Sequence, residues 1–221
     1  MKKRFRIFVE GDADKKFLSD YYHHLFQEKA PQYSINHTGD LKRDKTGGYK
    51  KLSDEINIRE MRINTDQDGV NLVIFDADKD IEARRAELLA IKEEFGVEFE
   101  LFLLPNNQDY GALEDLLEKI INQDNKCIFE CWENYEKELV KQEISWRTPP
   151  PLTTPAKKTK IYGYLEALLG ESLSQKNLIK EKERDYENAQ HWNLDAEYLE
   201  PLKEFLKQHL LKNTQEVMEM S

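Results

Sequence analysis

Short apolar runs alternate with amphipathic segments along the first half of the chain. Three runs, at residues 5–9, 70–75 and 99–104, are short, apolar and rich in β-branched or aromatic residues, as buried strands are. Residues 33–37 form a weaker fourth run. Because helical patterns separate these runs, we expect strands joined by crossover helices. The sequence therefore predicts an α/β fold with a mainly parallel sheet flanked by helices.

The predicted helices rest on apolar positions that recur every three or four residues. The clearest stripes lie in residues 14–28, which Pro31 ends, and in residues 113–121. Residues 81–95 predict a third helix, closed by Gly96 as a C-cap. Residues 49–62 predict a fourth. Residues 38–48, rich in Gly, Asp and Lys, are expected to form a loop.

The character of the chain changes after residue 125. Helical patterns continue at 128–139, 157–169 and 198–210, but no further strand pattern occurs. The proline-rich stretch 148–155 cannot form regular structure, because proline removes a backbone donor and fixes φ. It is expected to be a linker or a lid. We predict an α/β core in residues 1–125 and a helical C-terminal layer, residues 126–221, packed on it as one compact domain.

Composition narrows the class of protein. The formal net charge of the 221 residues is -10, which disfavours a general nucleic-acid coat protein and counts less against an enzyme that meets phosphates through bound cations. No apolar run approaches the ~20 residues of a membrane helix, and the N-terminus lacks the pattern of a signal peptide. We expect a cytoplasmic protein without a membrane partner. Cys127 and Cys131 are expected to be reduced and buried on one helix face.

Acidic residues follow each of the three strong strands. Because parallel strands end at the same edge of a sheet, these side chains should lie close together. Two carboxylates about 4 Å apart repel by roughly 4 kcal/mol at an effective dielectric constant of about 20, so a cluster needs a cation or raised pKa values. Oxygen ligands suit Mg²⁺ or Mn²⁺, and two such ions can clamp the oxygens of phosphoryl transfer. The acids are Glu10, Asp12, Asp14, Asp76, Asp78 and Glu114.

Most of these acids also have a purely structural interpretation. Asp12 or Asp14 could cap the following helix, Asp76 could form an Asx turn, and Glu114 could interact with a helix dipole. Asp78, two residues after Asp76, would point in the same direction if the chain stays extended. That spacing favours a shared ligand role for the two aspartates.

These motifs resemble the Toprim domain, in which a Glu follows an apolar first strand and a DxD follows a later one. The matching segments are FVEG and VIFDAD. The stretch EGDAD resembles the OLD-type (overcoming lysogenization defect) nucleases, and PNNQDYGALEDLL is similar to uncharacterised bacterial Toprim-like proteins related to that group. The resemblance covers residues 4–122 and implies a Toprim/Rossmann-like fold. The implied ligands of one or two Mg²⁺ or Mn²⁺ ions are Glu10, Asp14, Asp76, Asp78 and Glu114.

The OLD-type nucleases also carry a lysine beyond the sheet that assists phosphate chemistry. Lys158 or Lys160, in AKKTKIYGYL, would match it, and a solvated helix start is the alternative. Other features of the related families are missing. No GxxxxGKS or GxxxxGKT phosphate loop is present, so the ATPase portion of OLD proteins is absent. The chain is too short for a topoisomerase and lacks the zinc-binding cysteines of primases and recombination mediators.

Two functions from different classes follow. The first is a Mg²⁺-dependent phosphoryl-transfer enzyme, a nuclease acting on DNA or RNA, structured RNA included. Glu10 would be a metal ligand and acid–base group, and Lys158 or Lys160 would stabilise developing negative charge. The second is a non-catalytic Toprim-like module whose acids bind metal or a regulatory partner, such as a separate ATPase. The substrate and the oligomeric state stay open.

Overall fold

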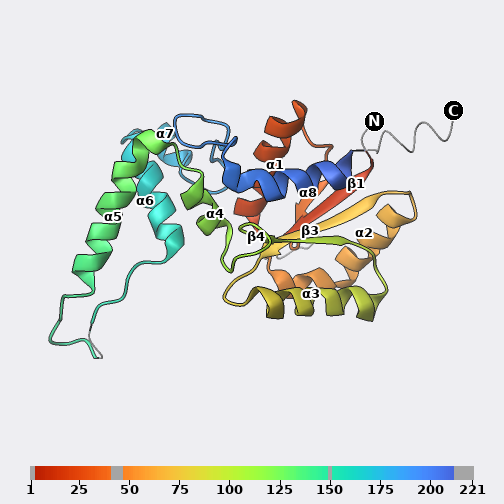
Figure 1. The fold of residues 1–221 in the computed structure, drawn as a ribbon, viewed down its shortest axis with the longest axis horizontal. Helices are drawn as coiled ribbons and strands as arrows, with labels where there is room; N and C mark the ends of the chain where they lie inside the picture. The colour runs from red at the N-terminus through yellow and green to blue at the C-terminus, as the bar shows by residue number, and fades with distance from the viewer. Residues whose placement is uncertain (1–2, 41–46, 149–150, 212–221) are drawn as a thin grey trace.

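A four-stranded parallel sheet forms the centre of the molecule (Figure 1). The structure is a computed structural model that describes residues 3–40, 47–148 and 151–211. The strands, in the spatial order β2-β1-β3-β4, are β1 (Phe5–Val9), β2 (Ile35–His37), β3 (Val70–Asp76) and β4 (Glu100–Leu104). All three strand pairings are parallel, and helices flank the sheet. The predicted α/β fold class is confirmed.

The helices follow the predicted stripes, with shifts of a few residues at their ends. The predicted helix 49–62 is divided, because Asp54 adopts an extended conformation with φ -62° and ψ 138°. Gly96 ends α3 in the left-handed conformation with φ 56°, as predicted. The helices are α1 (Asp12–Phe26), α2 (Glu55–Thr65), α3 (Ile81–Phe95), α4 (Leu113–Lys119), α5 (Lys126–Leu139), α6 (Lys157–Leu169), α7 (Leu173–Asn177) and α8 (Glu200–Leu210). Single 3-10 turns are η1 (Tyr49–Ser53), η2 (Gln123–Asn125) and η3 (Glu197–Leu199).

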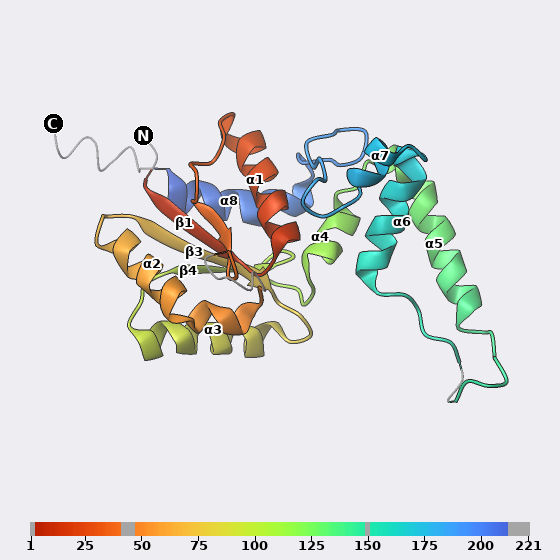
Figure 2. The ribbon, with the colours of Figure 1, turned by 180° about the vertical axis from the view of Figure 1, so that it is seen from behind.

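Each face of the sheet has its own hydrophobic core, because successive strand side chains point to opposite faces. Ile7 and Ile74 point to the face covered by α1, α4 and α8. Phe8 and Val73 point to the face covered by α2 and α3. Figures 1 and 2 show the resulting three layers, with the sheet between two groups of helices.

The C-terminal half of the chain first projects away from the sheet and then packs back against it. Helices α5 and α6 lie side by side and project as a hairpin (Figures 1 and 2). Helix α8 then lies along the sheet, where Phe205 packs against Phe102 of β4 with ring centroids 5.3 Å apart. The backbone N–H of Lys3 donates to the carbonyl of Leu210 at 2.9 Å. The end of the described chain is thus fixed beside its start.

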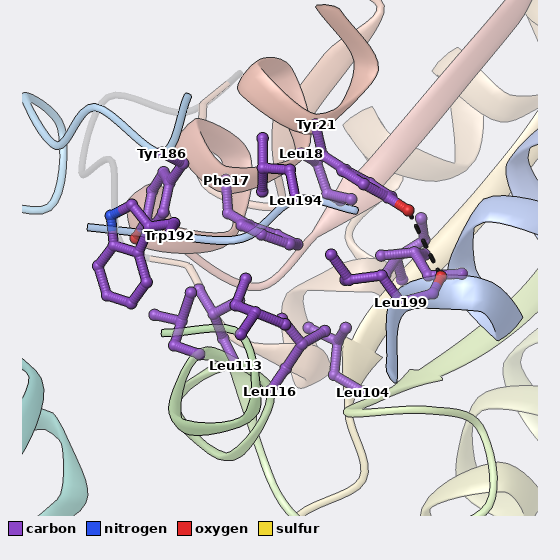
Figure 3. Packing of buried hydrophobic residues seen from close by; sticks show 14 of the residues in the cluster. Phe17, Leu18, Tyr21, Leu104, Leu113, Leu116, Tyr186, Trp192, Leu194 and Leu199 are labelled. Atoms are coloured by element: carbon purple, nitrogen blue, oxygen red, sulfur yellow. Dashed lines mark hydrogen bonds between the residues drawn. The ribbon is translucent and has the colours of Figure 1, made fainter. Parts of the chain in front are cut away.

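The segment between α7 and α8 fills the core beside α1 and α4 (Figure 3). Tyr186 and Trp192 are buried there, with ring centroids 5.6 Å apart. The ring of Tyr186 meets Phe17 of α1 edge-on at 5.4 Å. The hydroxyl of Tyr21 donates to the carbonyl of Leu199 at 3.4 Å. These contacts hold the C-terminal segment against the helix that follows β1.

The chain changes direction within the sheet at β1. The connection through α1 leads to β2 on one side of β1, whereas the connection through α2 returns to β3 on the other side. In open α/β sheets such a switch point creates a crevice at the carboxyl ends of the strands, where ligands bind. Here the crevice lies between β1 and β3, whose ends carry Glu10 and Asp76.

One prediction about α5 was wrong. The side chains of Cys127 and Cys131 are exposed, because the face of α5 that packs against α6 carries Phe129 and Trp132 instead. Among the described residues, no helix is both long and apolar enough to cross a membrane.

Candidate functional site

Four of the predicted ligand carboxylates, drawn from the three strand ends, line one pocket of about 340 Å³, which Asp12 and Glu181 also line. Glu10 directly follows β1, and Asp14 lies in the first turn of α1. Asp76 is the last residue of β3, and Glu114 lies in the first turn of α4, beyond β4. The pocket sits at the switch point of the sheet. The structure therefore brings together these four predicted residues, which we call the carboxylate cluster.

Backbone amides fix the directions of the carboxylates. The N–H of Asp76 donates to Oε1 of Glu10 at 3.2 Å. The N–H of Leu113, at the start of α4, donates to Oδ1 of Asp76 at 3.0 Å. The N–H of Gly11 donates to Oδ2 of Asp14 at 2.9 Å. These bonds leave the remaining lone pairs of Asp14 and Asp76 for other partners.

The acids of the carboxylate cluster are buried and repel one another. Burial raises the pKa of Asp14 to about 7, and the charges of Glu10 and Glu114 add to this rise. Burial likewise raises the pKa of Asp76, with further contributions from Asp14, Glu10 and Glu114. Among the described residues, no lysine or arginine forms an ion pair with any member of the cluster. Near neutral pH, bound protons or a bound cation would relieve the repulsion within such a cluster.

Glu10 lies between the other acids of the carboxylate cluster and a buried arginine. Burial raises the pKa of Glu10, Arg84 opposes this rise, and the charge of Asp78 adds to it. Arg84 is itself paired with Asp78, and its guanidinium stacks on the ring of Tyr49 at 3.8 Å. One side of Glu10 thus faces a positive charge, while its other side faces acids.

Asp78 lies outside the pocket of the carboxylate cluster. Its backbone has a φ of 54°, so the chain does not stay extended here and the condition for a shared direction with Asp76 is not met. Its N–H donates to the carbonyl of Gly111 at 2.8 Å, and this turn directs its side chain towards Arg84. The two aspartates of the DxD motif therefore point to different partners in this structure.

The two candidate lysines also lie in different surroundings. Lys158 lines the pocket and forms an ion pair with Glu181. Lys160 is buried, lies 3.1 Å from Glu118 and faces the ring of Phe129 at 4.7 Å. Of the two, only Lys158 is placed beside the carboxylate cluster.

A second polar group beside the pocket was missed in the sequence. Nε2 of His37 lies 2.8 Å from Oδ1 of Asp40 and 3.4 Å from Oδ1 of Asp12, a grouping that can hold a metal ion. Gly39 donates its N–H to Nδ1 at 3.1 Å, which places the proton of a neutral ring on Nε2, facing the acids. Lys15 also contacts Asp40. The group is therefore satisfied by hydrogen bonds and ion pairs. The sequence feature that could have indicated this group is Asp40, three residues after His37, which ends the weak strand.

Comparisons with known proteins give one match. A family model described as "Protein of unknown function (DUF3226)" matches residues 4–211. No curated protein matches the chain. No solved structure matches it either.

Proposed function

The chain belongs to the DUF3226 family, and we propose that it is a divalent-metal-dependent phosphoryl-transfer enzyme, a nuclease of DNA or RNA. The observation that carries this proposal is the carboxylate cluster, in which four acids converge at a switch-point crevice without a cationic partner among the described residues. The assignment to nucleic acid rests on the resemblance of the FVEG and VIFDAD segments to the Toprim domain.

The donor set fits Mg²⁺ or Mn²⁺. Every candidate ligand in the cluster is a hard carboxylate oxygen, and none of the described residues that line the pocket is a cysteine or histidine. A bound ion would polarise a phosphoryl oxygen and favour an attacking hydroxide. Asp14, Asp76 and Glu114 hold the ion in this proposal, and Glu10 serves as ligand and acid–base group. Lys158 attracts the phosphate and stabilises its developing charge.

A second candidate function is a metal-binding module without catalysis, which binds a regulatory partner. The observation in its favour is that both groups expected to assist chemistry are held in ion pairs. Asp78 contacts Arg84, and Lys158 contacts Glu181. An enzyme would have to release these groups when substrate binds, whereas a binding module would not.

Metal binding is tested by thermal unfolding with and without Mn²⁺. At millimolar Mn²⁺ we expect the Tm of the wild-type protein to rise by about 5 °C or more. Glu114→Gln should reduce this rise. The matched control is Glu82→Gln, because Glu82 occupies the same position in the first turn of α3 but its side chain is 81% exposed. No rise in wild type, or an equal rise in both variants, would contradict the metal site.

Catalysis is tested separately, with supercoiled plasmid, single-stranded DNA and structured RNA in the presence of Mn²⁺. We expect cleavage of at least one substrate, and its loss in Asp76→Asn. Cleavage retained in Asp76→Asn would place the activity elsewhere. A clear Mn²⁺ effect on Tm without cleavage of any substrate would favour the binding module.

A further inference from the structure

Lys158 of α6 is the one positively charged side chain among the described residues that line the pocket of the carboxylate cluster. The other charged residues in that lining are acids. Nζ of Lys158 nevertheless pairs with Oε1 of Glu181, in the segment after α7, and not with the carboxylate cluster. The side chain of Lys158 is 54% exposed and that of Glu181 is 22% exposed. The ion pair therefore lies where the pocket meets solvent.

The segment that carries Glu181 is anchored on both sides of this residue. Ile179 and Arg184 are buried, and Nε of Arg184 donates to the carbonyl of Ile179 at 3.0 Å, which closes the backbone turn between them. Nζ of the adjacent Lys182 lies 3.0 Å from Oδ2 of Asp12, which also lines the pocket. The carboxylate of Glu181 is thus held against the pocket by the fold of its own segment.

The pairing leaves the carboxylate cluster without the nearest available cation. Glu181 takes up the charge of Lys158, although Glu114 and Asp14 line the same pocket. A carboxylate and a phosphate group both offer anionic oxygens to a lysine ammonium. The oxygen of Glu181 therefore lies where a phosphate oxygen would have to lie to contact Lys158.

The ion pair is also of a kind that can be exchanged. Pairs that are partly exposed to water contribute little to stability, because each partner keeps much of its hydration and loses side-chain entropy. A phosphate group that also binds a metal ion at the cluster would gain two interactions when it displaces Glu181. An anion that reaches Lys158 alone would gain only one.

We propose that Lys158 and the carboxylate cluster form a subsite for one phosphate group of the substrate, and that Glu181 occupies this subsite in the free protein as a built-in competitor. This inference rests on the proposed function. Substrate binding then replaces the contact between Lys158 and Glu181 with a contact between Lys158 and phosphate. Glu181 keeps the subsite closed to anions that do not also bind the metal ion.

The test measures the Kd of short fluorescein-labelled single-stranded DNA and RNA by fluorescence anisotropy. Ca²⁺ is present, because it is a hard cation for oxygen ligands and serves to limit cleavage. Glu181→Gln keeps the length of the side chain and removes its charge. We expect the Kd to fall by about threefold or more, because the carboxylate no longer holds Lys158 or repels the phosphate.

Glu183→Gln is the matched control, because Glu183 lies two residues later, is exposed and does not line the pocket. Its Kd should equal that of wild type. Lys158→Met should raise the Kd. Glu181→Gln introduced into Lys158→Met should change the Kd less than it does in wild type, because Glu181 acts through Lys158.

The outcomes separate the competitor from the proposed function. Binding by wild type with an unchanged or higher Kd in Glu181→Gln would overturn the role of Glu181 and leave the proposed function intact. Equal falls in Glu181→Gln and Glu183→Gln would also overturn it, since net charge alone would explain them. So would an equal effect of Glu181→Gln with and without Lys158. Absence of binding by both wild type and Glu181→Gln would overturn the nucleic-acid function, and the competitor with it.

Discussion

Single residues at the pocket combine burial with mutual repulsion, and Asp14 shows both most clearly. Its folded-state pKa is about 7, whereas its ordinary value is 3.8. The folded protein therefore holds this proton more strongly than the unfolded chain does. Between these two pKa values, the contribution of Asp14 to the stability of the metal-free protein falls as the pH rises.

The first prediction concerns this pH dependence. In EDTA, the metal-free protein should lose free energy of unfolding between pH 5 and pH 8, and Asp14→Asn should be more stable than wild type at pH 8 by about 2 kcal/mol. Urea unfolding at both pH values measures the effect. Adding Mg²⁺ at pH 8 should favour wild type over the variant. A metal-free Asp14→Asn that is less stable at pH 8 would indicate that the carboxylate is structurally required.

Asp78 should respond in the opposite way. Its carboxylate is the main counter-charge of Arg84, whose side chain is 9% exposed. Asp78→Asn should therefore destabilise the metal-free protein, by about 1 kcal/mol because the aspartate itself is half exposed. Equilibrium unfolding in EDTA checks this value. A stabilised variant would mean that repulsion from Glu10 outweighs the attraction to Arg84.

The contrast between these acids shows what the sequence could predict at this scale. Glu10 and Asp76 follow strands, and the end of a parallel strand fixes where the next side chain lies. The direction of the Asp78 side chain depends on a left-handed backbone conformation and on an ion pair with Arg84, six residues later. The DxD spacing indicated neither of these features. The sequence also could not decide between Lys158 and Lys160, because lysines two residues apart on a helix point in different directions.

Among the elements, the α5–α6 hairpin depends on one close approach. A Cβ atom at Gly163 of α6 would lie 2.6 Å from the ring of Trp132 in α5. Such a distance is too short for ordinary packing, so the ring of Trp132 or one of the two helices would have to shift. The glycine has a packing role here, although glycine lowers helix propensity.

We predict that Gly163→Ala lowers the free energy of unfolding by about 1 kcal/mol, because overpacking outweighs the gain in helix propensity. Denaturant unfolding followed by tryptophan fluorescence measures this change. A more stable variant would show that Trp132 yields at little cost, and would contradict the tight contact.

Most elements could be predicted because their apolar periodicity is strong and local. The strands at 5–9 and 70–75 and the helices at 81–95 and 157–169 needed only this signal. The division of the predicted helix 49–62 could not be predicted, since it depends on the conformation of Asp54. The exposure of Cys127 and Cys131 could not be predicted either, because it depends on which face of α5 packs against α6 in the tertiary structure.

The whole molecule needs its C-terminal half to complete the core of the sheet. Helix α8 covers β4, and Tyr186 and Trp192 fill the space beside α1. The main chain of Asn122 also pairs with that of His191 at 2.9 Å. No periodic pattern marked the residues between α7 and α8, because their role depends on contacts with residues distant in the sequence, such as Phe17 and Asn122.

We therefore predict that residues 1–125 do not fold alone. A fragment ending at residue 125 should lack a cooperative thermal transition and near-ultraviolet circular dichroism, because the apolar face under α8 would be exposed. The full chain under the same conditions is the control. Cooperative unfolding of the fragment would contradict this dependence and would define an autonomous domain.

The projecting hairpin has a consequence for how this family can change during evolution. Its far end, residues 140–156, contributes no buried side chain among the residues that the structure describes. Doubling the length of such a connection costs only about 0.6 kcal/mol of closure entropy. Insertions can therefore accumulate at this tip while the pocket stays unchanged. The same tolerance makes the tip a suitable place for an affinity tag or a spectroscopic label.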